Sequence, residues 1–410
     1  MTRVFFFLLF ISAVVLVFGL IQVILLRKLH RDWWQKLWVR RAAWSLPVIG
    51  VVSIVLFVAG EYYQLGWLAQ AGSVLTVLSI VLEIGLMFSL PVSGAISAVN
   101  RWLDRRHARR DSQPETADKP IEHARDDVPI QSRRLFLKGA AAAVPVVTLA
   151  TGLTGVGRAF SDIRVYRRPI AIAGLPPALE GLRILQLSDL HLRRYVDLDD
   201  LEQLVADAAE YQPSLTLLTG DFADDVDKLP TALELVLGLN APLGTYAIMG
   251  NHEYYRGARL TKHRFRQSGV PMMINASRTL EYNGQPFSLS GIDDPVQMGG
   301  NYTEFFANAL RGALSQRENG DFTILMSHRP DAFPHAAQQG VQLTLAGHTH
   351  GGQIGVFGRS FLESAFPERY LWGEYTLGDS RLYTSCGAGH WFPFRVGCPA
   401  EAPVIELTRA

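Results

Sequence analysis

Carboxylate, amide and imidazole side chains follow five separate apolar runs between residues 185 and 350 of this 410-residue chain. The first run ends in Ser188-Asp189-Leu190-His191, and the last ends in Gly347-His348-Thr349-His350. The side chains in these positions that are able to bind a metal ion are Asp189, His191, Asp221, Asn251, His328, His348 and His350. Oxygen and imidazole donors without a thiolate suit Mn, Fe, Zn or Mg. We therefore interpret these residues as candidate ligands of divalent metal ions.

Each of the five runs is short and apolar on both faces, which is typical of a fully buried strand. The runs are 185–187, 215–218, 246–249, 322–326 and 341–346. In open α/β sheets, ligands bind outside the carboxyl ends of the strands, where the loops begin. Buried charged groups are very costly unless they are paired or coordinate a metal. The pattern therefore predicts that the seven side chains converge on one site.

The number of candidate ligands exceeds the four that a closed structural zinc site needs. If Asp221 bridges, two cations receive four protein ligands each, and open positions remain for water and substrate. A single Asp-x-His after a strand is more often a turn or a helix cap, and His348-Thr349-His350 alone could be a hydrogen-bonded pair in a loop. The ordered series of five strand ends favours the metal centre over these alternatives.

The order Asp-x-His, Gly-Asp-x-x-Asp, Gly-Asn-His-Glu, His and Gly-His-x-His resembles that of the calcineurin-like metallophosphoesterases. The resemblance covers roughly Leu182 to the C-terminus. It implies that one metal takes Asp189, His191, Asp221 and His350, and that the second takes Asp221, Asn251, His328 and His348. It also implies that two sheets pack face to face between helices. The runs 347–353 and 395–399 resemble the bacterial branch with membrane-associated members, except that Ala400 stands where that branch often has a second Pro.

The resemblance also implies a reaction. Two cations clamp a phosphoryl group and lower the pKa of a bridging water, which yields the hydroxide that attacks phosphorus. His252 is suited to donate a proton to the leaving oxygen. We expect Asp224 and Glu253 to support the site by orienting ligands rather than by binding metal.

Strand-like runs alternate with helical patterns in the same region. Asp199 to Tyr211 reads as a helix with Asp199 as its cap, and Leu229 to Leu239 reads as another helix. Strand–helix–strand units at this spacing imply mainly parallel pairing. Asp293 and Asp294 follow the strand-like run Phe287 to Ser290, and we interpret them as solvated loop carboxylates or supports of the site.

The first hundred residues contain three apolar segments long enough to cross a bilayer, Phe5 to Leu26, Ala43 to Ala59 and Leu68 to Leu90. The first lacks a small-residue cleavage site, which disfavours a cleaved signal peptide. Basic residues and tryptophans between Arg27 and Arg41 predict a cytoplasmic loop rather than a nucleic-acid patch. The formal net charge of +1 likewise produces no overall positive potential that would attract nucleic acid.

Residues 101–138 are expected to form a charged cytoplasmic linker, because the segment is poor in apolar residues. It ends in Ser132-Arg133-Arg134-Leu135-Phe136-Leu137-Lys138, which resembles a twin-arginine export signal and implies the export machinery as a partner. Residues 139–158 form a fourth apolar segment, and the alternative is an ordinary span with basic anchors. Both interpretations leave a catalytic domain, 159–410, outside the inner (cytoplasmic) membrane of a bacterium.

Two further features leave alternatives open. Glu83 lies within the third span, where burying a carboxylate costs free energy and a functional role is the default hypothesis. We favour a packed or protonated structural role. Cys386 and Cys398 form a disulfide in an oxidising compartment or are two small buried residues.

The sequence predicts a membrane-anchored phosphoesterase with two metals that hydrolyses phosphomono- or phosphodiesters of lipid or cell-envelope type. One alternative substrate class is the soluble nucleotides. The other alternative is a non-catalytic metal-binding membrane sensor that retained the fold.

Overall fold

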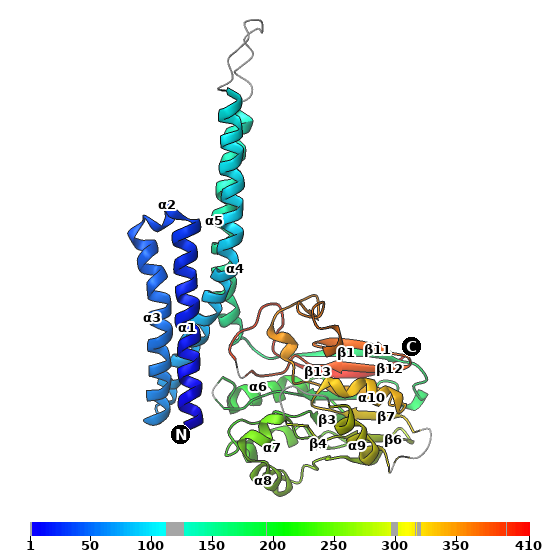
Figure 1. Ribbon diagram of the computed structural model, residues 1–410. Coiled ribbons are helices and arrows are strands. Elements are labelled where there is room, and N and C mark those ends of the chain that lie inside the picture. The colour runs from blue at the N-terminus through cyan, green and yellow to red at the C-terminus, as the bar shows by residue number, and fades with distance from the viewer. Residues whose placement is uncertain are drawn as a thin grey trace, which may run out of the picture. The chain divides into compact units, whose positions relative to one another are not determined.

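The computed structural model describes residues 2–111, 127–193, 195–296, 302–315, 317, 321–390 and 392–410. The chain divides into two compact units, Met1–Gly157 and Arg158–Ala410, here called the helical unit and the catalytic unit. Figure 1 shows helices alone in the helical unit and two packed sheets with flanking helices in the catalytic unit.

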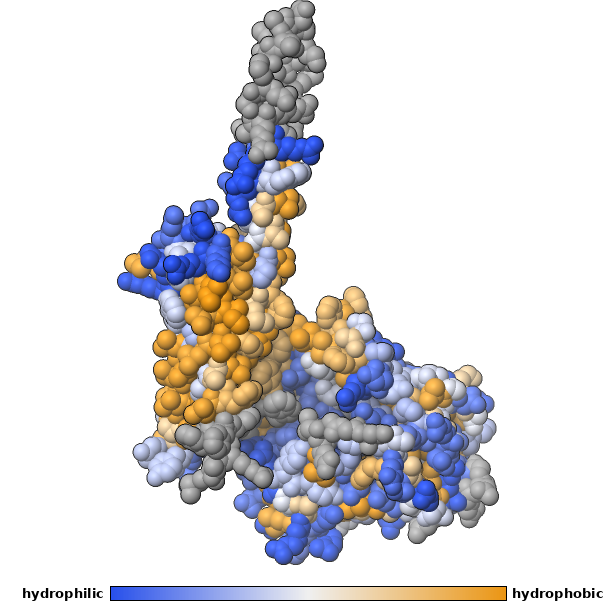
Figure 2. Space-filling view, in the orientation of Figure 1, coloured by the Kyte–Doolittle hydropathy of each residue, from blue (hydrophilic) through white to orange (hydrophobic). Residues whose placement is uncertain are grey.

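The helical unit contains α1 (Thr2–Leu29), α2 (Arg31–Trp34), α3 (Leu37–Tyr62), α4 (Gly66–Asp111) and α5 (Asp127–Arg158). Four helical segments are long and apolar enough to cross a membrane, by length and composition: Leu9–Leu29, Leu37–Tyr62, Gly66–Arg106 and Ser132–Arg158. The three predicted spans and the fourth apolar segment all overlap with these segments. In Figure 2, apolar side chains cover the middle of this unit, as expected for helices whose surroundings are lipid, and hydrophilic side chains gather at its end around α2.

Small residues allow α1, α3 and α4 to pack closely. A Cβ atom on Gly60 would lie 2.3 Å from the backbone nitrogen of Ala69, and one on Gly72 would lie 2.4 Å from that of Phe57. Such contacts are typical of membrane helices, because small residues let two backbones approach. Glu83 is fully buried, and its carboxylate has no hydrogen-bond partner among the described residues.

Helices α4 and α5 extend into both ends of the predicted charged linker. Helix α4 continues to Asp111 and α5 begins at Asp127, so that the Arg133-Arg134 pair lies within α5. The Arg134 guanidinium pairs with the Asp104 carboxylate at 3.2 Å and joins the two helices. Extending an existing helix costs little once it is nucleated, and Arg, Leu and Ala favour this extension. The remainder of the predicted linker, residues 112–126, lies outside the described residues.

The catalytic unit is a sandwich of two sheets, as predicted. The first has the strand order β1-β13-β2-β3-β4, and the second has the order β11-β12-β8-β7-β6-β5. The strands of the first sheet are β1 (Arg164–Ile172), β13 (Glu401–Arg409), β2 (Arg183–Leu187), β3 (Leu215–Leu218) and β4 (Thr245–Ala247). Those of the second are β11 (Gly373–Leu377), β12 (Ser380–Thr384), β8 (Leu343–Ala346), β7 (Thr323–Met326), β6 (Gln285–Gly291) and β5 (Ala276–Tyr282).

Parallel pairing dominates the strands next to the site. Strands β2, β3 and β4 are parallel neighbours, and so are β6, β7, β8 and β12. Strand β13 runs antiparallel to β2 and parallel to β1. Parallel neighbours direct their carboxyl ends to one edge, so the loops that follow these strands begin close together.

The three largest apolar cores among the described residues hold the sandwich together. The central core lies between the sheets and contains Ile184, Leu217, Ile324 and Leu345. A second core joins the first sheet to α6 (Leu198–Ala209), α7 (Leu229–Leu237) and α8 (Asn251–Ser268). A third joins the second sheet to α9 (Thr303–Leu314) and α10 (Phe333–Gln338). Figure 1 shows these two groups of helices on the two outer faces. Both sheets are therefore buried on both faces, which explains their continuous apolar runs.

The N-cap of α6 lies two residues before the predicted cap, Asp199. The N-cap is Asp197, whose side chain accepts from the backbone nitrogens of Asp199 and Asp200. Asp200 in turn accepts from the backbone nitrogen of Asp197 at 2.9 Å, which completes a capping box. Asp199 is not the cap because it lies in the first turn and donates its own backbone N–H to the Asp197 side chain, whereas the cap must precede that turn and accept from it.

Candidate metal centre

The seven candidate ligands lie at the carboxyl ends of five strands. Asp189 and His191 follow β2, Asp221 follows β3, and Asn251 is the first residue of α8 after β4. His328 follows β7 and His348 and His350 follow β8. The first three strands belong to one sheet and the last two to the other. The site therefore lies where the edges of the two sheets meet, and the structure brings all seven residues together.

Five of the seven have a left-handed backbone conformation. Their φ angles are +52° for Asp189, +48° for His191, +53° for Asp221, +69° for His348 and +49° for His350. Non-glycine residues pay a conformational cost in this region, and such strain concentrates at functional sites. The sharp turns aim successive side chains from one strand end into a single pocket.

Glycines make room for this crowding. A Cβ atom on Gly220 (φ +91°) would lie 2.5 Å from Nδ1 of His328. A Cβ atom on Gly250 would clash with the Asp221 carboxylate, and one on Gly347 would clash with Ser188 and Asp189. Each of these glycines directly precedes a candidate ligand in the sequence, so the Gly-Asp, Gly-Asn and Gly-His pairs of the motif have a steric origin.

The first group of ligand atoms consists of Asp189, His191 and His350. Nε2 of His191 lies 3.2 Å from Nε2 of His350, and the latter lies 3.5 Å from Oδ1 of Asp189. All three residues are at most 4 % exposed. Two imidazole nitrogens at this separation require a proton or a cation between them, because their lone pairs otherwise repel.

The second group consists of Asp221, His328 and His348, together with Asn251. Nε2 of His328 lies 3.3 Å from Oδ2 of Asp221, 3.2 Å from Oδ1 of Asn251 and 3.2 Å from Nδ1 of His348. Nδ1 of His328 contacts the carbonyl oxygen of Thr219 at 2.9 Å, which directs Nε2 toward the other three residues. A carbonyl acceptor on the distal nitrogen is the usual support of a metal-binding histidine.

Asp221 belongs to both groups. Its Oδ2 atom lies 3.3 Å from Nε2 of His328 in one group and 3.8 Å from Nε2 of His191 in the other. Burial opposes the charge on His328, but the Asp221 and Asp189 carboxylates outweigh burial and raise the pKa of His328 to about 10. Burial and neighbouring positive groups, in contrast, lower the pKa values of His348 and His350. The oxygen and nitrogen donors present fit divalent cations.

His252 stands beside these groups and is held by Asp224. The two side chains meet at 2.6 Å between Nδ1 and Oδ1, and the same carboxylate oxygen accepts from Nε of Arg256 at 3.2 Å. Burial disfavours the charged carboxylate, but His191 and His252 outweigh burial and hold the pKa of Asp224 well below its usual range. Asp224 thus orients His252, as expected for a supporting residue. The imidazole also lies close enough to Asp221 and His191 to bind a metal ion.

Glu253 supports the site through the backbone rather than through a ligand side chain. Its carboxylate accepts from the backbone nitrogens of Gly250 at 2.8 Å, Asp221 at 2.9 Å and Phe222 at 2.7 Å. Burial and the Asp221 charge raise the pKa of Glu253. This carboxylate joins the loop after β3 to the start of α8, and so fixes Asp221 relative to Asn251.

Sequence reasoning missed a buried group near the site, Arg395. Arg395 is 1 % exposed and donates to the carbonyl oxygens of five residues, Cys386, Gly387, Gly389, Cys398 and Pro399. These bonds fold residues 386–399 around Asp189, whose carbonyl oxygen accepts from the backbone nitrogen of Gly389 at 2.8 Å. The available signal for Arg395 was the resemblance of residues 395–399 to the bacterial branch of the family, but this resemblance assigned no role to Arg395.

The structure disfavours one of the two interpretations of Asp294, the solvated loop carboxylate. Asp294 is 3 % exposed and pairs with Nε of Arg329, the neighbour of His328, at 2.8 Å, which leaves its interpretation as a support of the site. Asp293 accepts both hydrogen-bond contacts of the Tyr254 hydroxyl, at 2.7 and 2.8 Å. Cys386 and Cys398 are free thiols in this structure and lie buried with Trp372. This arrangement matches the alternative of two small buried residues.

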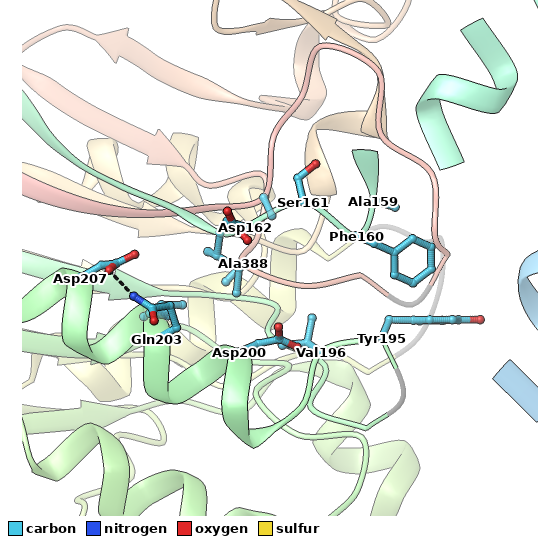
Figure 3. A pocket seen from close by; sticks show the side chains of 13 residues that line it. Ala159, Phe160, Ser161, Asp162, Tyr195, Val196, Asp200, Gln203, Asp207 and Ala388 are labelled. Carbon is cyan, nitrogen blue, oxygen red and sulfur yellow. Dashed lines mark hydrogen bonds between the residues drawn. The ribbon is translucent and has the colours of Figure 1, made fainter. Parts of the chain in front are cut away.

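An open hollow of about 420 Å³ lies over the ligands. Asp221, His252, His348 and His350 line it, together with Tyr255 and Gly352. A smaller hollow of about 140 Å³ lies between residues 159–163 and α6, with Asp200, Gln203 and Asp207 along its helical side (Figure 3). It contains none of the candidate ligands, so the chemistry belongs to the larger hollow.

A pocket of carboxylate, amide and imidazole donors with open space over it is suited to metal-dependent hydrolysis. Residues 182–352 match the family model of the calcineurin-like phosphoesterases. The chain is 32 % identical over 286 residues to the metallophosphoesterase YkuE of Bacillus subtilis, a match that covers 67 % of this chain and 97 % of that protein. The chain belongs to the calcineurin-like phosphoesterase family and is a metal-dependent phosphoester hydrolase.

Two other relatives extend this comparison. The phosphodiesterase YaeI of Escherichia coli is 28 % identical, and the match covers 55 % of this chain and 82 % of that protein. A bovine (Bos taurus) transmembrane protein with a metallophosphoesterase domain is 29 % identical, and the match covers 68 % of this chain and 64 % of that protein. Together with the four apolar helices, the second likeness indicates that this chain associates with a membrane.

Proposed function

We propose that the chain is a membrane-anchored phosphoesterase that binds two divalent cations and hydrolyses phosphomono- or phosphodiesters of lipid or cell-envelope type. The observation that carries the two-cation proposal is the position of Asp221, whose carboxylate lies within 4 Å of a histidine nitrogen in each ligand group. One carboxylate shared by two groups is the arrangement that two neighbouring cations require.

The proposed ligand sets follow the two groups. One cation takes Asp189, His191, Asp221 and His350, and the other takes Asp221, Asn251, His328 and His348. Mn, Fe, Zn and Mg are compatible with these donors. When bound, the cations neutralise the phosphoryl oxygens and activate water as the nucleophile.

His252 is the proposed proton donor to the leaving oxygen. Its Nδ1 atom is occupied by Asp224, so Nε2 remains for the substrate. Its side chain is 17 % exposed and lines the hollow, whereas His191 and His328 are almost fully buried. Partial exposure suits a group that exchanges protons with solvent between turnovers.

The proposed location is the inner membrane of a bacterium, with the catalytic unit on the extracytoplasmic side. The support is the distribution of basic residues, which are concentrated between α1 and α3 and again at the end of α4. Cytoplasmic loops carry such an excess. The Arg133-Arg134 pair before the fourth apolar segment supports export of the folded catalytic unit through the twin-arginine machinery.

The test is elemental analysis of the full chain in detergent, combined with a panel of lipid phosphoesters, nucleotides and a generic phosphodiester. We expect two divalent ions per chain and turnover that is fastest on the lipid esters. The Asp221→Asn variant is expected to lose both ions and activity. An Asp221→Asn protein that keeps two ions and full activity would contradict the shared-carboxylate assignment. Preference for nucleotides would support the alternative substrate class, and two bound ions without turnover on any ester would support the sensor.

A further inference from the structure

Large apolar side chains gather on one exposed segment of the catalytic unit, residues 354–366, here called the apolar loop. Phe357 is 101 % exposed and Phe361 is 70 % exposed, and Val356, Leu362 and Phe366 accompany them. Figure 2 shows this segment as an apolar protrusion at the upper edge of the catalytic unit. Single exposed apolar residues are normal on a protein surface, but a contiguous group indicates a binding surface.

The apolar loop has a defined backbone. It contains a hairpin of β9 (Gly355–Val356) and β10 (Arg359–Ser360), whose turn residues Phe357 and Gly358 both have positive φ angles, +51° and +78°. Such a turn is a tight hairpin connection, and it holds Phe357 at the tip. The backbone nitrogens of Gly355 and Phe361 donate to Val396 and Ile354 at 2.8 Å each. Backbone groups that are already paired are tolerated in an apolar medium.

The charges of the apolar loop balance. Arg359 and Glu363 are its two charged residues, and they pair with each other at 3.2 Å. Moving an uncompensated charge out of water is very costly. The apolar loop therefore carries no net charge that would keep it in bulk water.

The apolar loop packs on the rim of the metal centre. A Cβ atom on Gly352 would lie 2.9 Å from Cδ1 of Leu362 and 3.4 Å from Oγ of Ser360. Gly352 itself lines the hollow with His350. A molecule held by the apolar loop is thus within a few side chains of the candidate ligands.

The covalent connection between α5 and β1 is short. Helix α5, which contains the fourth apolar segment, ends at Arg158, and β1 of the catalytic unit begins at Arg164. A segment of this length spans at most about 20 Å even when it is extended. In a protein whose fourth apolar segment crosses a membrane, the start of β1 therefore stays within this distance of the end of that segment.

We propose that the apolar loop inserts into the interfacial layer of the bilayer that holds the apolar helices, and that it presents the metal centre to phosphoesters in lipid head groups. Phe357 and Phe361 enter the acyl boundary, while the Arg359–Glu363 pair stays at head-group level. The presentation of lipid phosphoesters to the metal centre, here called the substrate half of this inference, rests on the proposed phosphoesterase function. The insertion itself does not.

Insertion is tested by fluorescence quenching of the full chain in vesicles of phosphatidylethanolamine and phosphatidylglycerol. A Phe357→Cys variant carries an environment-sensitive dye, and Leu377→Cys, at another exposed apolar position of the same unit, is the control. Both native cysteines are fully buried and are not expected to react. We expect spin-labelled lipids to quench the dye at position 357 and aqueous iodide to quench it at position 377. Quenching by iodide at 357, or protection from both quenchers by protein, would overturn the proposal.

The substrate half is tested with a Phe357→Ser/Phe361→Ser double variant, with Leu260→Ser/Leu377→Ser as the matched control. Loss of two interfacial phenylalanines is expected to lower the ratio of vesicle-lipid to soluble-ester turnover about tenfold or more, and the control ratio is expected to stay constant. An unchanged ratio in the Phe variant would refute the role in presenting lipid. If the wild-type protein hydrolyses no ester at all, the proposed function fails, and the quenching experiment still decides insertion.

Discussion

Nδ1 of His252 lies 2.6 Å from Oδ1 of Asp224, and this carboxylate oxygen is also 3.7 Å from Nδ1 of His191. One carboxylate thus orients the proposed proton donor and contacts a candidate ligand of the first metal group. Two histidines with different proposed roles are coupled through a single oxygen atom.

Replacing Asp224 by Asn is expected to lower kcat by about 10²-fold, because an amide no longer stabilises the charged imidazole that donates the proton. KM and metal content are expected to change little, since neither substrate nor metal binds Asp224 in the proposed mechanism. Steady-state kinetics on a generic phosphodiester, together with elemental analysis, measures all three quantities.

The matched control for this prediction is Asp227→Asn, because the Asp227 side chain is 86 % exposed and lies on the same loop. It is expected to leave kcat unchanged. If Asp224→Asn lost its metal ions along with its activity, Asp224 would be a determinant of metal binding rather than of His252 orientation.

Gly220→Ala is expected to destabilise the catalytic unit and to weaken metal binding, because the new methyl group would lie 2.5 Å from Nδ1 of His328. Overpacking of this kind costs about 1–3 kcal/mol. Gly340→Ala is the control, since Gly340 also has a positive φ angle, +71°, but faces open space. Thermal unfolding with and without added Mn²⁺ compares the two variants. Equal losses in both would mean that backbone strain, rather than contact with His328, explains the glycine.

The seven candidate ligands were predictable because parallel strands end at one edge of a sheet, so order along the chain translates into proximity. Arg395 could not be found in the same way. It lies between Phe394 and Val396 in a loop, and its role depends on five carbonyl oxygens that only the folded loop 386–399 brings together. A side chain that binds backbone groups leaves no pattern of residue types in the sequence.

The partner of Asp294 was hidden for a related reason. Arg329 lies 35 residues further along the chain, after β7, and the two side chains meet only because β6 and β7 are neighbours in the second sheet. The helical ends of the charged segment, residues 101–138, could not be predicted for a different reason. Composition favoured a linker, but helix extension from α4 and the Arg134–Asp104 ion pair favour regular structure.

The stability of the catalytic unit is expected to decrease as the pH falls below about 6.5, in part because of His390. This side chain is 2 % exposed, its ring stacks on Tyr195 at 5.3 Å, and neither ring nitrogen has a hydrogen-bond partner among the described residues. Burial, with smaller effects of Arg395 and His191, lowers the pKa of His390 to about 3.

The direction of this pH dependence follows from the protonation of His390 in the unfolded and in the folded chain. Below pH 6.5 the unfolded chain binds a proton at His390, but the folded chain does not until the pH approaches 3. The contribution to stability is therefore fully present above about pH 6.5 and decreases by up to about 1.4 kcal/mol per pH unit as the pH falls through this window. His390→Asn is expected to reduce this slope by the equivalent of one bound proton. His263→Asn, at an exposed histidine, is expected to leave the slope unchanged. Urea unfolding between about pH 4.5 and 7.5 measures the slopes, and equal slopes in His390→Asn and wild type would exclude this origin.

Recognition of the Arg133-Arg134 pair can be separated from its charge. Changing both residues to Lys keeps two positive charges, so the orientation that basic residues impose on the first three apolar helices is expected to persist. Lysine lacks the planar guanidinium fork of arginine, so a receptor that reads the arginine pair is expected to reject the variant. The prediction is that the catalytic unit then stays inside the cell and becomes protected from protease added to spheroplasts. The control is Arg105→Lys/Arg106→Lys in α4, which makes the same change of residue type outside the motif. A protease-accessible catalytic unit in the Arg133→Lys/Arg134→Lys variant would show that the fourth apolar segment is an ordinary membrane span.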